Sequence, residues 1–188
     1  MFEVDAMQHT AEAYTNIALR EAEDAAPEYR PPTLQDGAEI HALIAACPPL
    51  DRNSLYCNLL QCSHFADTSI VAELDGRIVG WISGYILPTQ PDHLFIWQVA
   101  VHPTARGQNL GAMMITEILK RPACNAVTHL VTSITEENVA SWRMFSRFSG
   151  MMKTVLESRP WLRGETHLAG RHPTEHEAVI GPFAPASI

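Results

Sequence analysis

The stretch Leu94–Met114, with the sequence LFIWQVAVHPTARGQNLGAMM, decides the fold of this chain. Its first half is rich in β-branched and aromatic residues and stops at Pro103, which predicts a strand over 94–101. A short loop of basic, polar and glycine residues follows, and an apolar helix begins after it. A strand joined to a helix in this way directs free backbone N–H groups and the positive end of the helix dipole at one point. The stretch therefore predicts a binding site for a phosphate or pyrophosphate group.

The composition is typical of a globular protein with one domain. The chain has 188 residues, of which 46% are hydrophobic and 18% are charged. No run approaches the roughly 18 apolar residues of a membrane span, and the N-terminus lacks the basic start and apolar stretch of a secretion signal. We therefore expect a cytoplasmic protein that has no contact with a membrane.

Charge and cysteines limit the partners and the compartment. A formal net charge of −8 argues against nucleic acid, whose phosphates need a basic surface. It fits a cationic small substrate, and a solvated acidic surface explains it equally well. The four cysteines show no CxxC pair and no spacing of a disulfide framework, so we expect reduced thiols at Cys47, Cys57, Cys62 and Cys124.

The hydrophobic pattern predicts a single domain over 28–183 with a tail on each side. Residues 1–27 are acidic and rich in alanine, and we expect a flexible tail there and a short one over 184–188. We expect strands near Tyr29 and over 70–74, 77–87, 94–101, 127–133 and 178–180, and helices over 33–47, 53–64, 109–121 and 137–148. The chain after residue 148 is otherwise expected to be loop-like.

The order of these elements predicts the fold class. Asp75-Gly76 is a strong signal for a type I′ turn between two antiparallel strands. Antiparallel strands that precede βα units predict an α/β domain with a mixed central sheet flanked by helices. A Rossmann fold is excluded, because no GxGxxG is present and the phosphate loop follows the fourth strand rather than the first.

The phosphate loop resembles that of a known family. Arg106-Gly107-Gln108-Asn109-Leu110-Gly111 resembles the (Arg/Gln)-x-x-Gly-x-(Gly/Ala) loop of the GNAT-type N-acetyltransferases, which binds the pyrophosphate of acetyl-CoA. In that family the loop lies between a strand like Val99–Pro103 and a helix like Ala112–Met114. Asn109 stands where the family usually has glycine. Asparagine is the non-glycine residue that best tolerates a positive φ, so the loop can still form.

A second segment resembles the same family. The run NVASWRMF over 138–145 resembles the family's Asn-x-x-Ala-x-x-Leu-Tyr helix, whose asparagine contacts the pantetheine arm. In an arbitrary helix, Asn138 is a residue of the N-cap region and Phe145 is a core residue. Many members use a tyrosine at the position of Phe145 as general acid. Phenylalanine cannot donate a proton, so either another group supplies it or the thiolate leaves unassisted, which a thiol pKa of about 8.5 permits.

The resemblance implies the GNAT acyltransferase fold and acetyl-CoA as co-substrate. It also implies a set of residues that bind acetyl-CoA, taken from the strand end, the loop and the second helix. These residues are Val99, Val101, Arg106, Gly107, Gln108, Asn109, Leu110, Gly111, Ala112, Asn138 and Ser141.

A narrower resemblance covers residues from about 28 to 183. Segments 49–56, 95–101, 135–141 and 172–176 are similar to the acceptor-side, central-strand, CoA-side and C-terminal segments of the diaminobutyrate acetyltransferases of ectoine synthesis. In the last segment, residues 173 and 174 are proline and threonine where that family has acidic residues. The resemblance implies a homodimer that transfers acetyl to the 4-amino nitrogen of L-2,4-diaminobutyrate, a step toward the solute ectoine that is used against osmotic stress.

The same resemblance implies an acceptor site. The acceptor carries two ammonium groups and one carboxylate, so its site needs anions and a shaped wall. We expect Asp51 and Glu175 to supply charge, Tyr56 a hydroxyl and Trp97 an aromatic face, with His172 also in the site. The expected catalytic residues are Asp51, Glu175 and Trp97. Other interpretations are a helix N-cap for Asp51, a core position for Trp97 and a solvated tail position for Glu175.

The proton on the acceptor nitrogen is the main energetic problem. At a pKa of about 10.4, forming the free amine at neutral pH costs on the order of 4.6 kcal/mol. A carboxylate paired with that nitrogen raises its pKa and opposes the reaction. We therefore expect Asp51 and Glu175 to divide two tasks, holding the 2-ammonium group and relaying the proton from N4. The amide of Val99 is the expected donor to the thioester oxygen, with positioning as the dominant catalytic term.

Other functions stay open. The acceptor can be another small amine or a protein N-terminus, and the domain can be a non-catalytic acetyl-CoA-binding unit, which the missing tyrosine favours. His172 and His176 with Glu175 between them have the spacing of a metal-binding helix. The irregular composition around Pro173 argues against that helix and no third ligand is placed, so we expect no metal.

Overall fold

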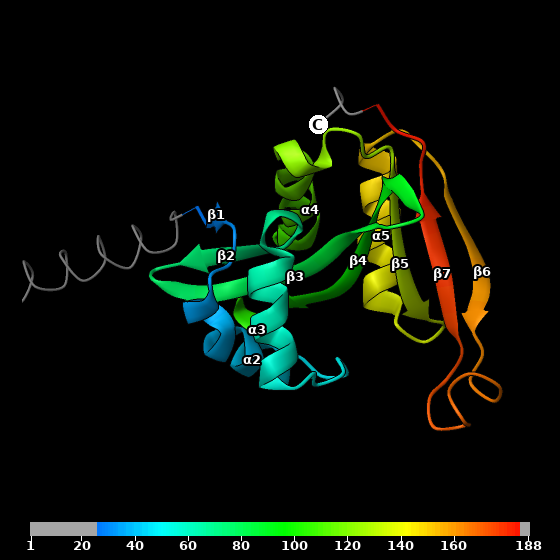
Figure 1. Cartoon of the computed structure of the whole chain (residues 1–188), viewed down its shortest axis with the longest axis horizontal. Coiled ribbons are helices and arrows are strands. Elements are labelled where there is room, and N and C mark those ends of the chain that lie inside the picture. Colours follow the sequence, from blue (N-terminus) through cyan, green and yellow to red (C-terminus); the bar gives the residue numbers. More distant parts are fainter. Residues whose placement is uncertain (1–25, 185–188) are drawn as a thin grey trace, which may run out of the picture.

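A computed structural model describes residues 26–184, which form a seven-stranded mixed sheet with helices on both faces (Figure 1). The strand order is β1-β2-β3-β4-β5-β7-β6, and among the described strands only β4 and β5 pair in parallel. The strands are β1 (Glu28–Arg30), β2 (Ile70–Leu74), β3 (Arg77–Leu87), β4 (Gln90–Val101), β5 (His129–Thr135), β6 (Leu156–Leu162) and β7 (Glu175–Ile180). The helices are α2 (Gly37–Ala45), α3 (Leu55–His64), α4 (Leu110–Leu119) and α5 (Val139–Met151), with 3₁₀ turns at Leu34–Asp36, Ala66–Thr68, Pro103–Ala105 and Pro122–Cys124.

Local sequence signals set the ends of several elements. Asp75 and Gly76 both have a positive φ (51° and 71°), as a type I′ turn requires, and they join β2 to β3 as predicted. The hydroxyl of Ser54 accepts a hydrogen bond from the amide of Cys57 (3.1 Å) and caps α3. The interpretation of Asp51 as the cap of this helix is therefore wrong.

Each face of the sheet has its own hydrophobic core. α4 and α5 cover one face, where the core includes Ile96, Ile118 and Phe148, each at most 1% exposed. α2 and α3 cover the other face, over a smaller core around Ile40 and Trp81 (Figure 1). No helix within 26–184 is both long and apolar enough to cross a bilayer.

β4 and β5 pair only over part of their length. The register runs from His93↔His129 to Ile96↔Thr132, although β4 continues to Val101 and β5 continues beyond the last pair. At that last pair, the buried hydroxyl of Thr132 donates to the carbonyl of Ile96 (3.0 Å). Beyond it the strands separate, and no other strand of residues 26–184 pairs with this edge of β4.

A β-bulge at Trp97 changes which face the end of β4 presents. Ile96 and Gln98 lie opposite consecutive residues of β3, so Trp97 is the extra residue. Strict alternation would place Ile96 and Ala100 on the same face. Instead Ile96 lies in the α4–α5 core, Ala100 lies in the α2–α3 core, and Val99 packs against the α4–α5 core.

The C-terminal part of the chain differs from the prediction. β6 and β7 pair in antiparallel fashion at the edge of the sheet, where the sequence predicts a loop-like tail and a strand over 178–180 only. That prediction is wrong. β6 is an exposed edge strand that contains Pro160, and β7 begins with Glu175 and Glu177, so neither shows the apolar alternation by which a strand is identified.

Other differences concern the ends of elements. β4 begins at Gln90 rather than 94, and the helix predicted over 33–47 is a 3₁₀ turn followed by α2. The two predicted tails lie outside the described residues, except for residues 26, 27 and 184. The predicted mixed sheet flanked by helices is confirmed.

Candidate active site

A cavity of about 690 Å³ lies where the end of β4, the start of α4 and the start of α5 meet. All the residues that the sequence predicts to bind acetyl-CoA line it, with one exception. The lining residues of this set are Val99, Val101, Arg106, Gly107, Asn109, Leu110, Gly111, Ala112, Asn138 and Ser141. The exception is Gln108, which is exposed between two loop residues with a positive φ and does not line the cavity.

The loop before α4 presents backbone N–H groups to the cavity. Gly107 and Asn109 have positive φ values of 85° and 62°, so Asn109 adopts the left-handed conformation that glycine adopts most easily. No side chain caps α4, so its first N–H groups lack an acceptor within the described part of the chain. These groups and the helix dipole favour an anion at this end of the cavity.

Two further cations face the same cavity. Arg143 and Arg147 on α5 line it, and both side chains are exposed at its rim. They are four residues apart and therefore lie on one face of the helix. The sequence prediction missed them, although their spacing on a helix next to the phosphate loop is a usable signal. Together with Arg106 they suit a co-substrate that carries several phosphate charges.

The backbone of Val99 is free on the cavity side. The amide of His102 donates to β3 (2.8 Å), so alternation along the strand turns the amides of Val99 and Val101 away from β3. The carbonyl of Val101 already accepts hydrogen bonds from Arg106 Nε (3.0 Å) and Cys47 Sγ (3.3 Å). Val99 therefore offers an N–H group at the place where the sequence predicts the donor to the thioester oxygen.

Helix α5 contributes a capping residue and a core residue. Asn138 Oδ1 accepts a hydrogen bond from the amide of Ser141 (3.1 Å), so Asn138 caps the helix while it also lines the cavity. Phe145 is only 2% exposed and belongs to the α4–α5 core. The position of the family's tyrosine thus carries no proton donor.

A buried amide on the other face of β4 holds the loop before α3. Gln98 is 7% exposed, and its Nε2 donates to the backbone carbonyl of Asp51 (2.8 Å). Its Oε1 accepts a hydrogen bond from Asn53 Nδ2 (3.3 Å). The sequence prediction missed Gln98 and Asn53, because the bulge that turns Gln98 to this face has no clear signal in the sequence.

Glu175 lies within electrostatic reach of Asp51. It is half-buried at the start of β7, and the nearby hydroxyl of Ser133 on β5 favours its ionised form. Burial nevertheless raises the pKa of Glu175, the charge of Asp51 raises it further, and His172 and His176 act in the opposite direction. The interpretation of Glu175 as a solvated tail residue is wrong.

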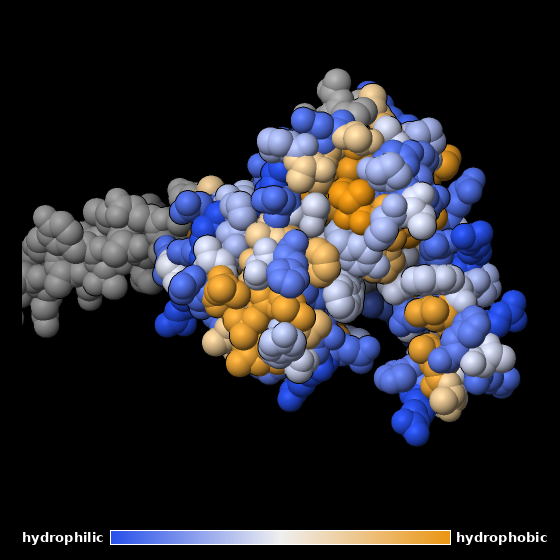
Figure 2. Space-filling model, viewed as in Figure 1, coloured by the Kyte–Doolittle hydropathy of each residue, from blue (hydrophilic) through white to orange (hydrophobic). Residues whose placement is uncertain are grey.

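The aromatic residues of the predicted acceptor site are at the surface. Trp97 is 44% exposed and contacts Tyr85 edge-on (6.4 Å between ring centroids), so the interpretation as a core residue is wrong. Tyr56 is 70% exposed and, among the described residues, makes no hydrogen bond with Asp51, Trp97 or Glu175. The molecular surface is hollowed between the apolar area over α2 and α3 and the end of β6 and β7 (Figure 2).

His172 and His176 do not form a metal-binding helix. His172 is exposed in the loop before β7, and His176 lies within that strand. The change from helix to strand removes the i, i+4 geometry that the metal interpretation requires.

Comparison with known proteins agrees with this geometry. Residues 18–151 match the acetyltransferase (GNAT) family, which is more than half of the chain. The chain belongs to this family. The acetyltransferase is 45% identical over 152 residues to the L-2,4-diaminobutyric acid acetyltransferase of Methylotuvimicrobium alcaliphilum, covering 81% of this chain and 88% of the relative. It is 47% identical over 155 residues to the enzyme of the same name from Bordetella parapertussis, covering 82% and 83%.

A solved structure is similar over the whole fold of this acetyltransferase. It is the diaminobutyrate acetyltransferase EctA from Paenibacillus lautus in complex with its substrate L-2,4-diaminobutyric acid and coenzyme A, with a TM-score of 0.80 and 35% identity. The similarity covers 84% of this chain and 96% of that chain. The predicted GNAT fold and the predicted acyltransferase class are confirmed, and acetyl-CoA is the co-substrate. The site described above fits this co-substrate: the free amides at the start of α4 and the three arginines suit its phosphates, and the edge of β4 offers backbone groups to its thioester arm.

The conformation of Asn109 leads to a prediction about the loop. N109G keeps the KM for acetyl-CoA near the wild-type value, because glycine adopts a φ of 62° at no steric cost. N109V raises this KM by about 5- to 30-fold, since the left-handed region costs a β-branched residue roughly 1–2 kcal/mol or more. Steady-state kinetics measure both values. N125V is the control, because Asn125 has an ordinary φ of −58°; an equal effect in this control contradicts the prediction.

The buried amide leads to a second prediction. Q98L removes both hydrogen bonds to the 51–53 loop, so it raises the KM for the amine acceptor by about tenfold, the effect of one or two net hydrogen bonds. We expect a smaller change in the KM for acetyl-CoA, because Gln98 holds residue 51 directly and reaches the cavity only through the preceding segment 47–50, which lines it. Q61L is the matched control, since Gln61 is also fully buried but bonds only within α3. A change in the acetyl-CoA KM alone would show that Gln98 does not position the acceptor loop.

Proposed function

We propose that this acetyltransferase transfers the acetyl group of acetyl-CoA to the 4-amino nitrogen of L-2,4-diaminobutyrate. The product, N4-acetyl-L-2,4-diaminobutyrate, is the one expected in ectoine biosynthesis. The relatives with 45% and 47% identity carry this substrate in their names, and the similar solved structure holds it together with coenzyme A.

The observation that carries the proposal is the electrostatic proximity of two carboxylates, Asp51 and Glu175, that make no ion pair within the described residues. Glu177, two residues along β7 from Glu175, is neutralised by Arg159 (2.7 Å from Nε to Oε2). Asp51 and Glu175 make no ion pair within the described residues, and the charge of Asp51 adds to burial in raising the pKa of Glu175. A doubly cationic acceptor relieves this repulsion, whereas a neutral or anionic acceptor does not.

The two carboxylates divide the work. Asp51 is exposed, and its backbone is held by Gln98, so it suits the 2-ammonium group as a fixed negative charge. Glu175 has the raised pKa that a proton acceptor needs, so it takes the N4 proton through a water molecule. A direct ion pair between Glu175 and N4 would stabilise the ammonium form and oppose the reaction.

The opposite face of β4 completes the chemistry. Bound acetyl-CoA supplies an activated thioester, whose oxygen accepts a hydrogen bond from the amide of Val99 as negative charge develops. Phe145 cannot protonate the leaving sulfur, and a thiol with a pKa of about 8.5 leaves as the thiolate. Holding the amine against the thioester is then the main contribution of the protein.

The assembly and the setting belong to the same proposal. We propose a homodimer that acts in the cytoplasm during osmotic stress, with residues 28–183 as one acetyltransferase domain. Exposed apolar side chains, among them Leu55 (42%), Trp97 (44%) and Trp161 (40%), support a second subunit. The free thiols of all four cysteines support a reducing compartment. Light scattering that gives the monomer mass would contradict the dimer.

Turnover with a panel of amines tests the function. Release of CoA thiol is measured with acetyl-CoA and L-2,4-diaminobutyrate, and in parallel with lysine, an unsubstituted diamine and a peptide with a free N-terminus. We expect the highest kcat/KM with diaminobutyrate and acetylation at N4, read by NMR of the product. A higher kcat/KM with another amine would identify that amine as the substrate in place of diaminobutyrate. Binding of acetyl-CoA without turnover would show a non-catalytic domain.

Substitution of the carboxylates predicts a specific kinetic pattern. D51N and E175Q each reduce kcat/KM for diaminobutyrate by about 10- to 150-fold, the loss of a hydrogen bond to a charged group. Because Glu175 acts in its ionised form and its pKa is raised, the wild-type kcat/KM falls with decreasing pH at a value above the ordinary glutamate pKa. In D51N this fall moves to lower pH, since the charge that raises the pKa is gone.

Stability and a neighbouring glutamate provide the controls. The raised pKa of Glu175 means that the fold disfavours its ionised form, so its contribution to the free energy of unfolding decreases as pH rises through the ordinary glutamate pKa and then the raised one. E175Q removes this cost, and we expect its Tm at neutral pH to equal or exceed that of the wild type. E177Q breaks only the exposed pair with Arg159 and changes kcat/KM by less than about fivefold. Equal losses in E177Q and E175Q would contradict the assignment.

A further inference from the structure

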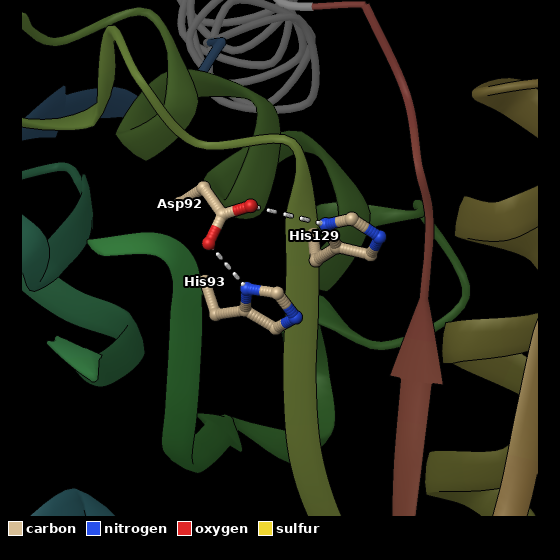
Figure 3. Close-up of side chains that lie close together, drawn as sticks. All are labelled: Asp92, His93 and His129. Carbon is tan, nitrogen blue, oxygen red and sulfur yellow. Dashed lines mark hydrogen bonds and ion pairs between the residues drawn. The ribbon is translucent and has the colours of Figure 1, made fainter. Parts of the chain in front are cut away.

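A cluster of two imidazoles and one carboxylate lies where the parallel pairing of β4 and β5 begins (Figure 3). Asp92 and His93 belong to β4, and His129 is the first residue of β5. His93 and His129 are the first register pair of the parallel β4–β5 pairing. His93 lies six residues before Val99, or about 20 Å along the strand, so the cluster is separate from the cavity.

The carboxylate of Asp92 lies against both rings. Its Oδ1 is 2.8 Å from His93 Nδ1, and its Oδ2 is 3.9 Å from His129 Nδ1 (Figure 3). The hydroxyl of Thr128 is 2.9 Å from His129 Nδ1. The side chains are 48% (Asp92), 15% (His93) and 23% (His129) exposed, so solvent and ions can reach them. Acetyl transfer, as derived above, uses none of these groups.

We propose that Asp92, His93 and His129 bind a divalent transition-metal cation of the Zn²⁺ class. The ligands are the two Nδ1 atoms and one carboxylate oxygen, and solvent completes the coordination shell. A ligand set of two imidazoles and one carboxylate suits Zn²⁺, Ni²⁺ or Cu²⁺ better than Ca²⁺ or Mg²⁺, which prefer oxygen alone.

The distances are close to those that such a cation needs. Metal–ligand bonds of about 2.0–2.1 Å in tetrahedral geometry place neighbouring ligand atoms about 3.3 Å apart. The three ligand atoms lie within 4.8 Å of one another here, so a bound cation draws them together by up to about 1.5 Å. The rings are stacked (4.3 Å between centroids, 7° between planes), and a metal ion lies near the plane of each imidazole that binds it. Binding therefore turns the two rings out of their stack and toward each other.

The place of the cluster indicates what the cation does. β4 and β5 share only four register pairs before they separate at the active site, and the cluster lies on the first of these pairs. A cation bound from both strands links them at their paired end and stabilises the folded state, because it binds the native arrangement only. The site is structural and leaves the chemistry of acetyl transfer unchanged.

Metal titration of the full chain tests the proposal. The protein, without an added histidine tag and treated with a chelator, is titrated with Zn²⁺ by calorimetry and with Co²⁺ by visible absorption. We expect one cation per chain, intense d–d bands of four-coordinate Co²⁺, and a Tm that rises with the Zn²⁺ concentration. We expect the affinity for Zn²⁺ to fall by about tenfold or more in each of the variants H93A, H129A and D92A. Loss of a residue that only supports a ligand already costs about tenfold in metal affinity, and loss of the ligand itself costs at least as much.

Two controls keep the test decisive. H64A removes an exposed histidine at the end of α3 and leaves the affinity unchanged. If a cluster variant does not fold, the wild type is titrated with paramagnetic Co²⁺ and followed by NMR. We expect the ring signals of His93 and His129 to shift at lower Co²⁺ concentrations than those of the other histidines. No saturable binding, or binding that persists in all three cluster variants, overturns the proposal. The acetyl-transfer assay with and without Zn²⁺ is independent of this result, so failure of the metal site leaves the proposed function untouched.

Discussion

The separation of β4 from β5 after four parallel pairs is the constraint on which the site depends. The last pair, Ile96↔Thr132, is held by the buried Thr132 hydroxyl, and beyond it β4 has a free edge. That edge exposes the amide of Val99 to the cavity, which is also lined by the first residues of α4 and α5. A fully paired strand would use the same amide for the sheet, and no co-substrate could lie along it.

The bulge at Trp97 gives one short stretch of β4 two functions. It turns Gln98 to the acceptor face, where the buried amide holds the loop of Asp51, and it leaves Val99 on the acetyl-CoA face. In the mechanism proposed above, adjacent residues of one strand have separate tasks: Gln98 holds the acceptor loop and Val99 offers its amide to the thioester. This arrangement explains why positioning, rather than strong acid–base chemistry, is the main catalytic contribution.

The two faces also differ in charge. The acetyl-CoA side has Arg106, Arg143 and Arg147 together with the free amides of the loop, and it suits an anionic co-substrate. On the side proposed for the acceptor, Asp51 and Glu175 make no ion pair within residues 26–184, which suits a cationic amine. Because the low-dielectric strand separates these charges, each face attracts its own substrate, and neither charge set neutralises the other.

The sequence by itself determined what depends on local patterns. The Asp75-Gly76 turn, the phosphate loop followed by an apolar helix, and the helix start at 138–145 are encoded within a few residues each. The loop and the 138–145 segment together carry the resemblance to the family. Tertiary structure decided what depends on partners far along the chain. β6 becomes a strand because β7 pairs with it, the bulge at Trp97 arises from the register with β3, and Glu175 acquires its raised pKa from burial beside Asp51. None of these partners lies within the few residues that a local pattern can sample.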